Sequence, residues 1–233
     1  MVQRSTQTAC RQCGICCRSG GAALHHADIA LLEQGVIPRR DLVTIRKGEF
    51  AHNPVSRKVQ PTMEEIVKLR GKGRGWECCY YEPVSKGCSI YGTRPLACST
   101  LKCWAPSESL KLVETDLLSR IGILGTDSAT ILLISEHDGY CPLPDFKNLG
   151  YNLDCRESET LKRLDKSVNG DIAFRNHAVT ISGMVLEDEM FLFGRPLFQM
   201  LHPFGLDIVQ DGMVLSVRIN RNRKRGAGEK YRD

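Results

Sequence analysis

Cysteine is the residue type in this chain with the clearest chemical potential, because eleven thiols occur in 233 residues and most of them fall in two clusters. The first cluster consists of Cys10, Cys13, Cys16 and Cys17. The second consists of Cys78, Cys79, Cys88, Cys98 and Cys103. Thiols at this density either form disulfides or bind a soft or borderline metal.

The cellular compartment separates these two alternatives. Residues 1–9 contain no apolar segment of the kind found in signal peptides, and the longest apolar runs are too short to cross a bilayer. We therefore expect a cytoplasmic protein without a membrane association, in which thiols stay reduced. Metal binding is then favoured over disulfides, and an odd number of cysteines also prevents complete pairing within one chain.

The spacing of the first cluster favours iron–sulfur chemistry. Cys10, Cys13 and Cys16 follow the C-x2-C-x2-C pattern, which supplies three ligands to one 4Fe-4S cluster in bacterial ferredoxins. Zinc sites more often use paired C-x2-C elements, and the second cluster contains none. Zinc remains the alternative, since thiolates bind both metals. Cys17 directly follows Cys16, so its side chain diverges and serves a second metal, bridges two metals or binds none.

The two clusters together resemble the CxxCxxCC cysteine-cluster family (YkgJ-type), a family of zinc- or iron-chelating domains. The matching strings are C-x-x-C-G-x-C-C, which starts at Cys10, and C-S-I-Y-x-x-R-P-x-x-C, which starts at Cys88. The resemblance covers about residues 8–104. It implies that the metal ligands are Cys10, Cys13, Cys16, Cys17, Cys79, Cys88 and Cys98, with Cys103 as a less secure member.

Residues around the second string also have a predicted role. Neighbouring residues on a strand face opposite sides, so one of Cys78 and Cys79 reaches the metal; we favour Cys79 and regard Cys78 as an extra thiol. Pro95 is expected to fix the turn that presents Cys98. Arg94 either donates hydrogen bonds to a thiolate or carboxylate near the metal or simply begins a helix.

Other candidate ligands are given a structural role. His25 and His26 lie near the first cluster, but an exposed or capping role is favoured for both. The other four histidines are scattered and have no partner in the sequence. Cys141 and Cys155 are interpreted as small buried residues.

Three functions are compatible with these features. The favoured one is a cytosolic metal-binding protein whose cluster is structural or transfers electrons. The second is a metal chaperone or storage module. The third is a protein-modifying enzyme. One branch of the family is similar to flagellin lysine methylases, which use S-adenosylmethionine and an iron–sulfur cluster. This sequence has no glycine-rich methyltransferase motif to support that activity, and no catalytic residue is assigned. The expected partners are a metal ion or cluster and a possible protein, while nucleic acid is disfavoured.

The predicted fold class is α+β. Residues 1–104 form a Cys-rich, metal-stapled half with a β-hairpin, and residues 105–217 form a mainly helical half that packs with it and ends in a second hairpin. Residues 218–233 form a basic, flexible tail. Helices are expected at residues 28–34, 39–47, 107–121, 157–168 and 172–189, while residues 128–136 fit helix or strand and residues 48–62 a loop. Hairpins are expected from 65–70 with 76–81 and from 206–210 with 213–219.

Overall fold

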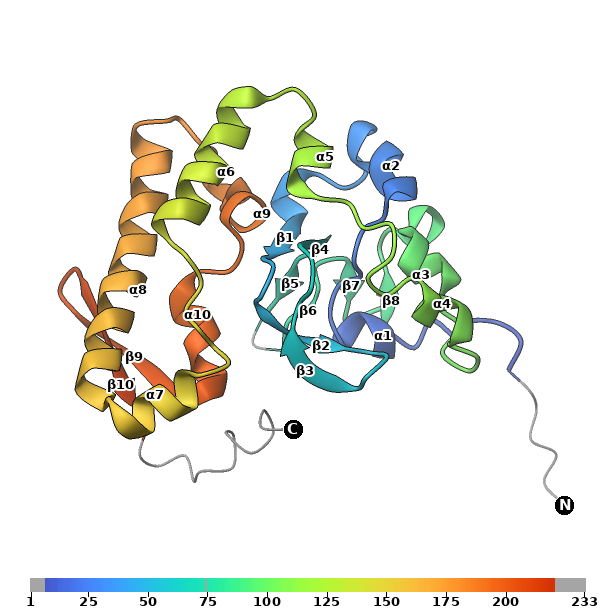
Figure 1. The fold of residues 1–233 in the computed structure, drawn as a ribbon. Helices are drawn as coiled ribbons and strands as arrows, with labels where there is room; N and C mark the ends of the chain where they lie inside the picture. Colours follow the sequence, from blue (N-terminus) through green and yellow to red (C-terminus); the bar gives the residue numbers. More distant parts are fainter. Residues whose placement is uncertain (1–6, 74, 221–233) are drawn as a thin grey trace, which may run out of the picture.

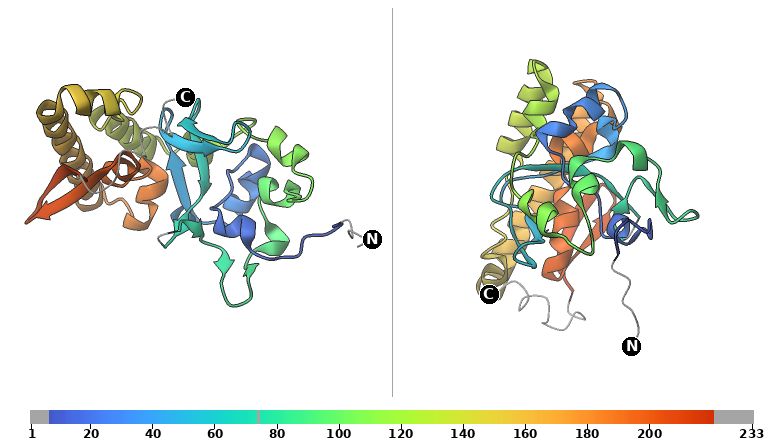
Figure 2. Two further views of the ribbon diagram at one scale, coloured as in Figure 1. Left: turned by 90° about the horizontal axis from the view of Figure 1, so that it is seen from below. Right: turned by 90° about the vertical axis from the view of Figure 1, so that its right-hand side faces the viewer.

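The computed structural model describes residues 7–73 and 75–220, which form two parts lying side by side (Figures 1 and 2). The N-terminal part contains short strand pairs and short helices, and the C-terminal part contains the long helices α6 and α8 and a β-hairpin. The predicted α+β class is therefore confirmed. Residues 221–233, which make up most of the basic tail, and residues 1–6 lie outside the described residues. Within the described ranges, no helix combines the length and apolar character that a membrane span requires.

All strands in the described ranges form antiparallel pairs. The pairs are β1 (Leu42–Ile45) with β4 (Ile66–Leu69), β2 (Phe50–Asn53) with β3 (Lys58–Pro61), β5 (Gly71–Lys72) with β6 (Glu77–Cys78), β7 (Tyr81–Glu82) with β8 (Gly87–Cys88), and β9 (Leu206–Asp211) with β10 (Val214–Ile219). An isolated two-stranded pair is marginally stable in water. Packing against helices and loops must therefore stabilise each of these ladders.

Short helices connect the strand pairs, and longer ones follow them. The α-helices are α1 (Ile15–Arg18), α2 (Ile29–Glu33), α3 (Leu96–Thr100), α4 (Ser107–Lys111), α5 (Arg120–Leu124), α6 (Ser128–Tyr140), α7 (Leu149–Cys155), α8 (Glu157–Thr180), α9 (Glu189–Phe193) and α10 (Leu197–Leu201). The 3-10 helices are η1 (His26–Asp28), η2 (Arg39–Asp41), η3 (Tyr91–Thr93), η4 (Leu186–Asp188) and η5 (His202–Phe204).

The predicted helix at residues 39–47 is wrong, because this segment forms η2 and then strand β1. All four residues of β1 are buried, so the strand lacks the polar and apolar alternation that would mark it in the sequence. β1 packs against α9, and the hydroxyl of Thr44 donates to the carbonyl of Phe191. A short apolar run buried on both faces cannot be told from a helix by periodicity alone.

The predicted hairpin from 65–70 with 76–81 has the wrong partner. Strand β4 pairs with β1, and the hairpin that remains joins only Gly71 and Lys72 to Cys78 and Glu77. Gly71 is required in this hairpin, because a Cβ there would lie 2.6 Å from the ring of Trp76. The hairpin still delivers Cys78 to the N-terminal part, as the sequence predicts.

Two other segments differ from their predictions. Residues 48–62 form the β2–β3 hairpin instead of a loop, and Asn53 caps its turn by accepting from two backbone amides. The helix expected at 107–121 ends after one turn. The reason is local, because Glu114 and Asp116 adopt left-handed φ values of 59° and 51°, which end a right-handed helix.

Several predicted elements are confirmed. Helix α8 covers the predicted residues 157–168 and continues to Thr180, so it also takes in the first half of the predicted 172–189 helix. Residues 128–136 lie in α6, and the hairpin predicted near Asp211 is β9–β10. Strand β10 extends to Ile219, so two residues assigned to the basic tail belong to a strand.

Two clusters of buried apolar side chains lie under these elements. The first is formed by Leu24, Ile37, Leu42, Val67, Leu69, Cys78, Tyr81, Leu118, Leu124, Ile134, Ala178, Phe191, Leu192 and Phe193. The second is formed by Phe146, Leu149, Leu164, Val168, Leu197, Met200, Leu201, Leu206 and Val217. The first cluster draws residues from both parts of the chain, so the strand pairs that position the thiols share their core with helices α6, α8 and α9.

A buried ionic network also joins the two parts. The guanidinium of Arg120 donates to Glu65, to Asp138 at 2.7 Å and to the carbonyl of Leu192 at 2.7 Å. Arg120 is 5 % exposed, so these bonds form away from water. The network therefore links α5 at once to the residue before β4, to α6 and to α9.

Candidate metal centre

Cys16 and Cys17 lie on α1, a single helical turn that begins after Gly14. Gly14 has a left-handed φ of 72°, and a Cβ there would lie 2.4 Å from Cε2 of Tyr81 and 3.0 Å from the carbonyl oxygen of Lys86. Tyr81 is in β7, and Lys86 immediately precedes β8. The glycine therefore allows the first cysteine motif to pack directly against the hairpin that carries the second.

We expect Gly14→Ala to lower the free energy of unfolding by about 2 kcal/mol, since it adds a left-handed backbone penalty to a steric clash. Gly35→Ala is the matched control, because Gly35 also has a left-handed φ, of 70°, but a Cβ there would meet no other group within 4 Å. Urea denaturation of both variants measures the difference. Equal losses in the two variants would show that contact with Tyr81 is not what requires glycine.

Cys78 is the last residue of β6, Cys79 follows it, and their two thiols are hydrogen-bonded to each other. Cys78 is buried, and its pKa is lowered to about 7, first by a hydrogen bond from the Cys79 thiol and also by the nearby ammonium groups of Lys72 and Lys68. The Cys79 thiol lies 3.8 Å from the carbonyl oxygen of Asp41, and its pKa is raised by its bond to Cys78 and by burial. The expected strand alternation between the two cysteines is not present, and it is Cys78 that acts on the pKa values of Cys17 and Cys98. Cys79 as a ligand stays a prediction.

Cys98 is carried by α3, whose start is fixed by a distant carboxylate. Pro95 occupies the N-cap in an extended conformation, and its carbonyl accepts from the amide of Ser99. Oδ1 of the buried Asp28 accepts from the amide of Leu96 at 2.7 Å. Asp28 directly precedes α2, yet its side chain makes no cap bond within that helix. It instead orients the helix that presents Cys98.

Five thiols from α1, β6, β8 and α3 lie within electrostatic range of one another. Burial, and then the proximity of Cys78, Cys88, Cys17 and Cys16, raises the pKa of Cys98 to about 12. Burial, followed by Cys16, Cys88 and Cys78, raises the pKa of Cys17 to about 12 as well. Thiols with such pKa values are protonated at neutral pH, so a metal that binds them must displace their protons.

Arg94 lies beside this group of thiols. Its guanidinium carbon is 3.7 Å from the centre of the Tyr91 ring, and its charge acts to lower the pKa of Cys88. Burial has the larger effect and leaves the pKa of Cys88 raised. Nε of Arg94 is buried without a hydrogen-bond partner among the described residues. Of the two roles predicted for Arg94, a position at the start of a helix is present, since Arg94 directly precedes Pro95, the N-cap of α3. A hydrogen bond from Arg94 to a thiolate or carboxylate is not found among the described residues.

Three other predicted ligands are exposed. Cys10 and Cys13 are exposed on the segment before α1, and Cys103 is exposed after α3. The amide of Gln12 donates to Sγ of Cys10, and Nε2 of Gln7 lies 3.9 Å from Sγ of Cys103. The role of these cysteines as ligands therefore stays a prediction.

The remaining histidines and cysteines near the motifs have other contacts. Nδ1 of His25 bonds to a backbone carbonyl at 2.9 Å, and Nδ1 of His26 lies 2.9 Å from a carboxylate oxygen of Asp116. Cys141 is buried, as predicted, whereas Cys155 is exposed. These contacts agree with the structural role expected for the two histidines.

Within the described ranges, a single set of three His, Cys, Asp or Glu residues has ligand atoms within 4.8 Å of one another, namely His137, Cys141 and Asp171. Nε2 of His137 lies 2.8 Å from Oδ1 of Asp171, which also accepts from Nε of Arg175. Oδ2 of Asp171 accepts from the amide of Leu197. The carboxylate is already saturated and sits beside a guanidinium, so this set is part of a buried ionic network and is a poor cation site.

Only a weak signal for this network is present in the sequence. His137 and Cys141 are four residues apart, the separation that brings side chains onto one face of a helix. Their partner Asp171 comes from α8, and no local pattern connects it to α6. The interpretation of His137 as a residue without a partner is therefore replaced by a buried bond to Asp171.

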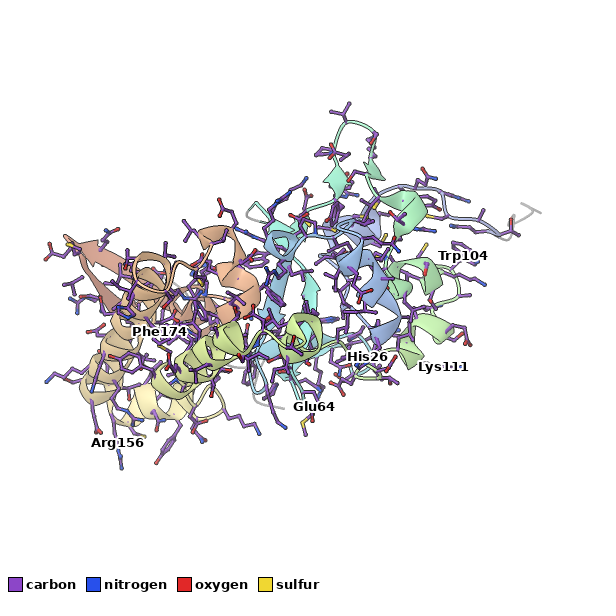
Figure 3. All side chains as sticks on the ribbon, turned by 90° about the horizontal axis from the view of Figure 1, so that it is seen from above. His26, Glu64, Trp104, Lys111, Arg156 and Phe174 are labelled. Atoms are coloured by element: carbon purple, nitrogen blue, oxygen red, sulfur yellow. The ribbon has the colours of Figure 1, made fainter. Side chains whose placement is uncertain are left out.

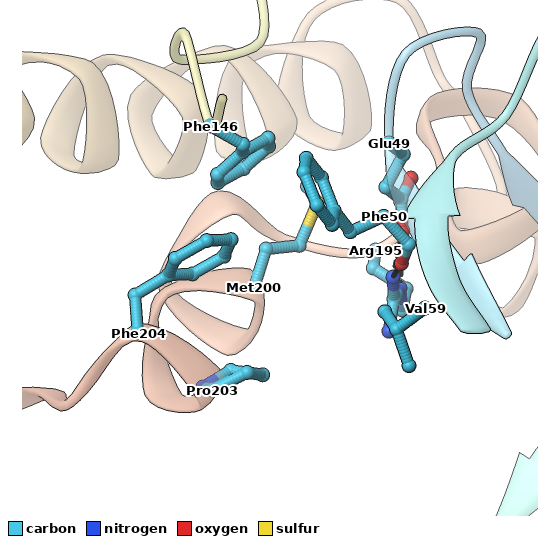
Figure 4. A pocket seen from close by; sticks show the side chains of 8 residues that line it. All are labelled: Glu49, Phe50, Val59, Phe146, Arg195, Met200, Pro203 and Phe204. Atoms are coloured by element: carbon cyan, nitrogen blue, oxygen red, sulfur yellow. Dashed lines mark hydrogen bonds and ion pairs between the residues drawn. The ribbon is translucent and has the colours of Figure 1, made fainter. Parts of the chain in front are cut away.

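Two cavities of the described chain are lined by residues other than cysteine. One of 40 Å³ is lined by Glu49, Phe50, Val59, Phe146, Arg195, Met200, Pro203 and Phe204 (Figure 4). A groove of 340 Å³ opens beside it, between Lys47 and Lys147. Figure 3 places Trp104, which follows Cys103, at the opposite end of the molecule from Arg156 and Phe174.

Thiols that converge from four short segments of an α+β chain define a cysteine-rich metal-chelating domain. Residues 9–117 match the family model CxxCxxCC, described as "Putative zinc- or iron-chelating domain", and the chain is similar to that family over this segment. The matched range includes both cysteine clusters, which confirms the resemblance seen in the sequence. No curated protein and no solved structure matches the chain.

Proposed function

We propose that this protein holds an iron–sulfur cluster through thiols of both cysteine motifs and uses it as a structural or electron-transfer centre. The observation that carries the proposal is the electrostatic coupling of five cysteines from four segments. These are Cys16, Cys17, Cys78, Cys88 and Cys98. An all-thiol donor set suits iron–sulfur clusters and zinc, and suits hard cations such as Mg²⁺ or Ca²⁺ poorly.

The separation of the sulfur atoms favours a cluster over a single zinc ion. Zinc binds thiolates at about 2.3 Å, which places tetrahedral ligand sulfurs about 3.8 Å apart. No three cysteine sulfurs of the described chain lie within 4.8 Å of one another, although five thiols are coupled. A cluster with several metal atoms fills such a wider space. Zinc is the alternative metal.

Charged side chains around the thiols support the binding of an anionic metal–thiolate centre. Lys68 and Lys72 both act to lower the pKa of Cys78, and Arg94 acts in the same direction on Cys88. Their positive charges would stabilise thiolates once a metal has displaced the protons. When bound, an iron–sulfur cluster would supply one-electron chemistry that these side chains do not have.

Protein purified without oxygen should be brown, with broad absorbance near about 400 nm, and should contain iron and sulfide. Cys98→Ser removes the most extensively coupled thiol, so we expect it to lose most of the bound iron. Cys155→Ser is the control, because Cys155 is exposed on α7 and should leave the metal content unchanged. Elemental analysis with electron paramagnetic resonance measures both variants. A colourless protein with stoichiometric zinc would reject the iron version of the proposal.

A second candidate, metal transfer or storage, is favoured by one observation. Cys10, Cys13 and Cys103 are exposed and lie outside the coupled group. Exposed thiols near a metal centre allow ligand exchange with an incoming acceptor. Fast removal of the metal by a competing chelator, slowed when Cys10 and Cys13 are replaced by serine, would support transfer. Metal that does not exchange would leave the static centre as the better description.

A further inference from the structure

Both cysteine-bearing segments lack carboxylates. Residues 7–27 and residues 83–107 contain no Asp or Glu. They do contain five basic residues, namely Arg11, Arg18, Lys86, Arg94 and Lys102. All lysine, arginine, aspartate and glutamate residues of these two segments are thus basic, whereas the whole chain has 32 basic and 27 acidic residues. The thiol-bearing segments are therefore one of two strongly basic stretches of the chain, the other being residues 218–233.

Four of these basic side chains are exposed and form no ion pair within the described chain: Arg11, Arg18, Lys86 and Lys102. Some exposed lysines elsewhere are paired, while others, such as Lys162 and Lys166, are not. Lys111 lies 2.8 Å from Glu108, and Lys47 lies 3.5 Å from Glu64. The four unpaired cations consequently present their charge to solvent.

Contacts in the structure bring these cations onto the thiol-bearing end of the molecule. The backbone of Lys86 lies against Gly14, which begins the helix that ends in Arg18. Gln7, on the segment that leads to Arg11, lies beside Cys103, the neighbour of Lys102. Figure 1 shows α1, β8 and α3 grouped at the same end. We call Arg11, Arg18, Lys86 and Lys102 the basic rim.

The thiolate charge is already offset by cations closer to the thiols than the basic rim. Arg94 stacks on Tyr91 and acts on Cys88, and Lys72 donates to two backbone carbonyls while acting on Cys78. These inner side chains already offset thiolate charge at short range. Acidic side chains do occur close by, since Glu82 in β7 and Glu77 in β6 flank the hairpins. Neither is paired with a member of the basic rim in the described chain.

Apolar side chains at this end are also left in solvent. Ile15, next to Cys16, is 61 % exposed, and Val84, at the tip of the β7–β8 hairpin, is 99 % exposed. Exposed aliphatic residues ringed by cations are typical of a protein-binding surface, which has an apolar centre and a polar rim. A surface for single-stranded nucleic acid would instead offer exposed aromatic rings for base stacking, and Tyr91 is covered by Arg94.

We propose that the basic rim, with Ile15 and Val84, is the docking surface for an acidic face of a partner protein. Each cation of the basic rim lies within two residues of a cysteine of the two clusters, so this partner would approach the metal centre itself. The inference therefore deepens, and rests on, the proposed metal-binding function. Unpaired surface charge of one sign speeds the encounter with an oppositely charged partner and makes binding sensitive to salt.

Fluorescently labelled poly-L-glutamate serves as the probe, with the full-length, metal-loaded protein and fluorescence anisotropy as the readout. The test variant is Arg18→Glu with Lys86→Glu. The control is Lys162→Glu with Lys166→Glu, two exposed positions on α8 that change the net charge by the same amount. We expect the test variant to bind about tenfold more weakly or worse, and the control to change by less than about twofold. Added salt should weaken wild-type binding.

Three outcomes would overturn the docking proposal. The first is that the wild type does not bind polyglutamate detectably. The second is that both double variants weaken binding equally. The third is that the wild type binds a single-stranded oligonucleotide more tightly than polyglutamate and the test variant loses that binding, which would assign the surface to nucleic acid. The basic residues after position 220 are present in both variants, so their contribution cancels. Metal content is measured in parallel. A wild type without metal that still binds polyglutamate through Arg18 and Lys86 would refute the metal function alone.

Discussion

Arg120→Met is expected to lower the free energy of unfolding by about 3–5 kcal/mol, the largest effect that we expect of any single change in this chain. Arg120 is buried and bonds to Glu65, Asp138 and the carbonyl of Leu192. Methionine fills a similar volume, but it removes the guanidinium from both carboxylates and from the carbonyl of Leu192. Glu65 then keeps only the backbone amide of residue 120, and Asp138 keeps a 3.5 Å contact with Arg46. An uncompensated buried charge accounts for most of the cost. Urea denaturation followed by circular dichroism measures the change.

Arg163→Met on α8 is the matched control, because Arg163 is exposed and should change stability little. A double-mutant cycle with Glu65→Met isolates the buried pair. Removing both partners should cost less than the sum of the single changes, since neither charge is then left unpaired. If the losses in the free energy of unfolding were additive, the result would contradict a specific Arg120–Glu65 interaction. The stability lost in the single variants would then be assigned to packing.

Asp28→Ala is expected to cost about 3 kcal/mol and to reduce the metal content of the protein. Asp28 is 3 % exposed, and its two oxygens accept from the amides of His25 and Leu96. Alanine would leave both buried N–H groups unsatisfied, at about 1–3 kcal/mol each. The bond to Leu96 also fixes the start of α3, so its loss should allow the helix that carries Cys98 to move.

Asp28→Asn provides the comparison, because an amide keeps one acceptor oxygen and should lose about half as much stability. Hydrogen exchange of the α3 amides and elemental analysis are the two readouts. We expect faster exchange in α3 and lower metal content in the alanine variant than in the asparagine variant. Unchanged exchange in α3 together with full metal content would show that Asp28 does not position Cys98.

The chemistry of the candidate site was largely predictable, because it depends on the spacing of cysteines within short segments of the sequence. The Cys10 to Cys17 motif and the string from Cys88 to Cys98 identify a metal-chelating domain, and the family match over residues 9–117 agrees. The choice between Cys78 and Cys79 was not predictable. Cys78 pairs with Gly71 in the β5–β6 hairpin and is buried, whereas Cys79 follows the strand and is half-buried, and these positions depend on tertiary contacts.

By itself, the sequence determined the α+β class, the long helix α8, the final hairpin around Asp211 and the presence of two thiol motifs. These features depend on side chains a few residues apart, whose relative positions the local backbone sets. Only the tertiary structure decided that β1 pairs with β4, that Asp28 caps α3 and that His137 bonds to Asp171. These pairs form because segments that are distant in the sequence are buried against each other. The residues next to a buried strand or carboxylate in the sequence do not indicate which distant segment it will contact.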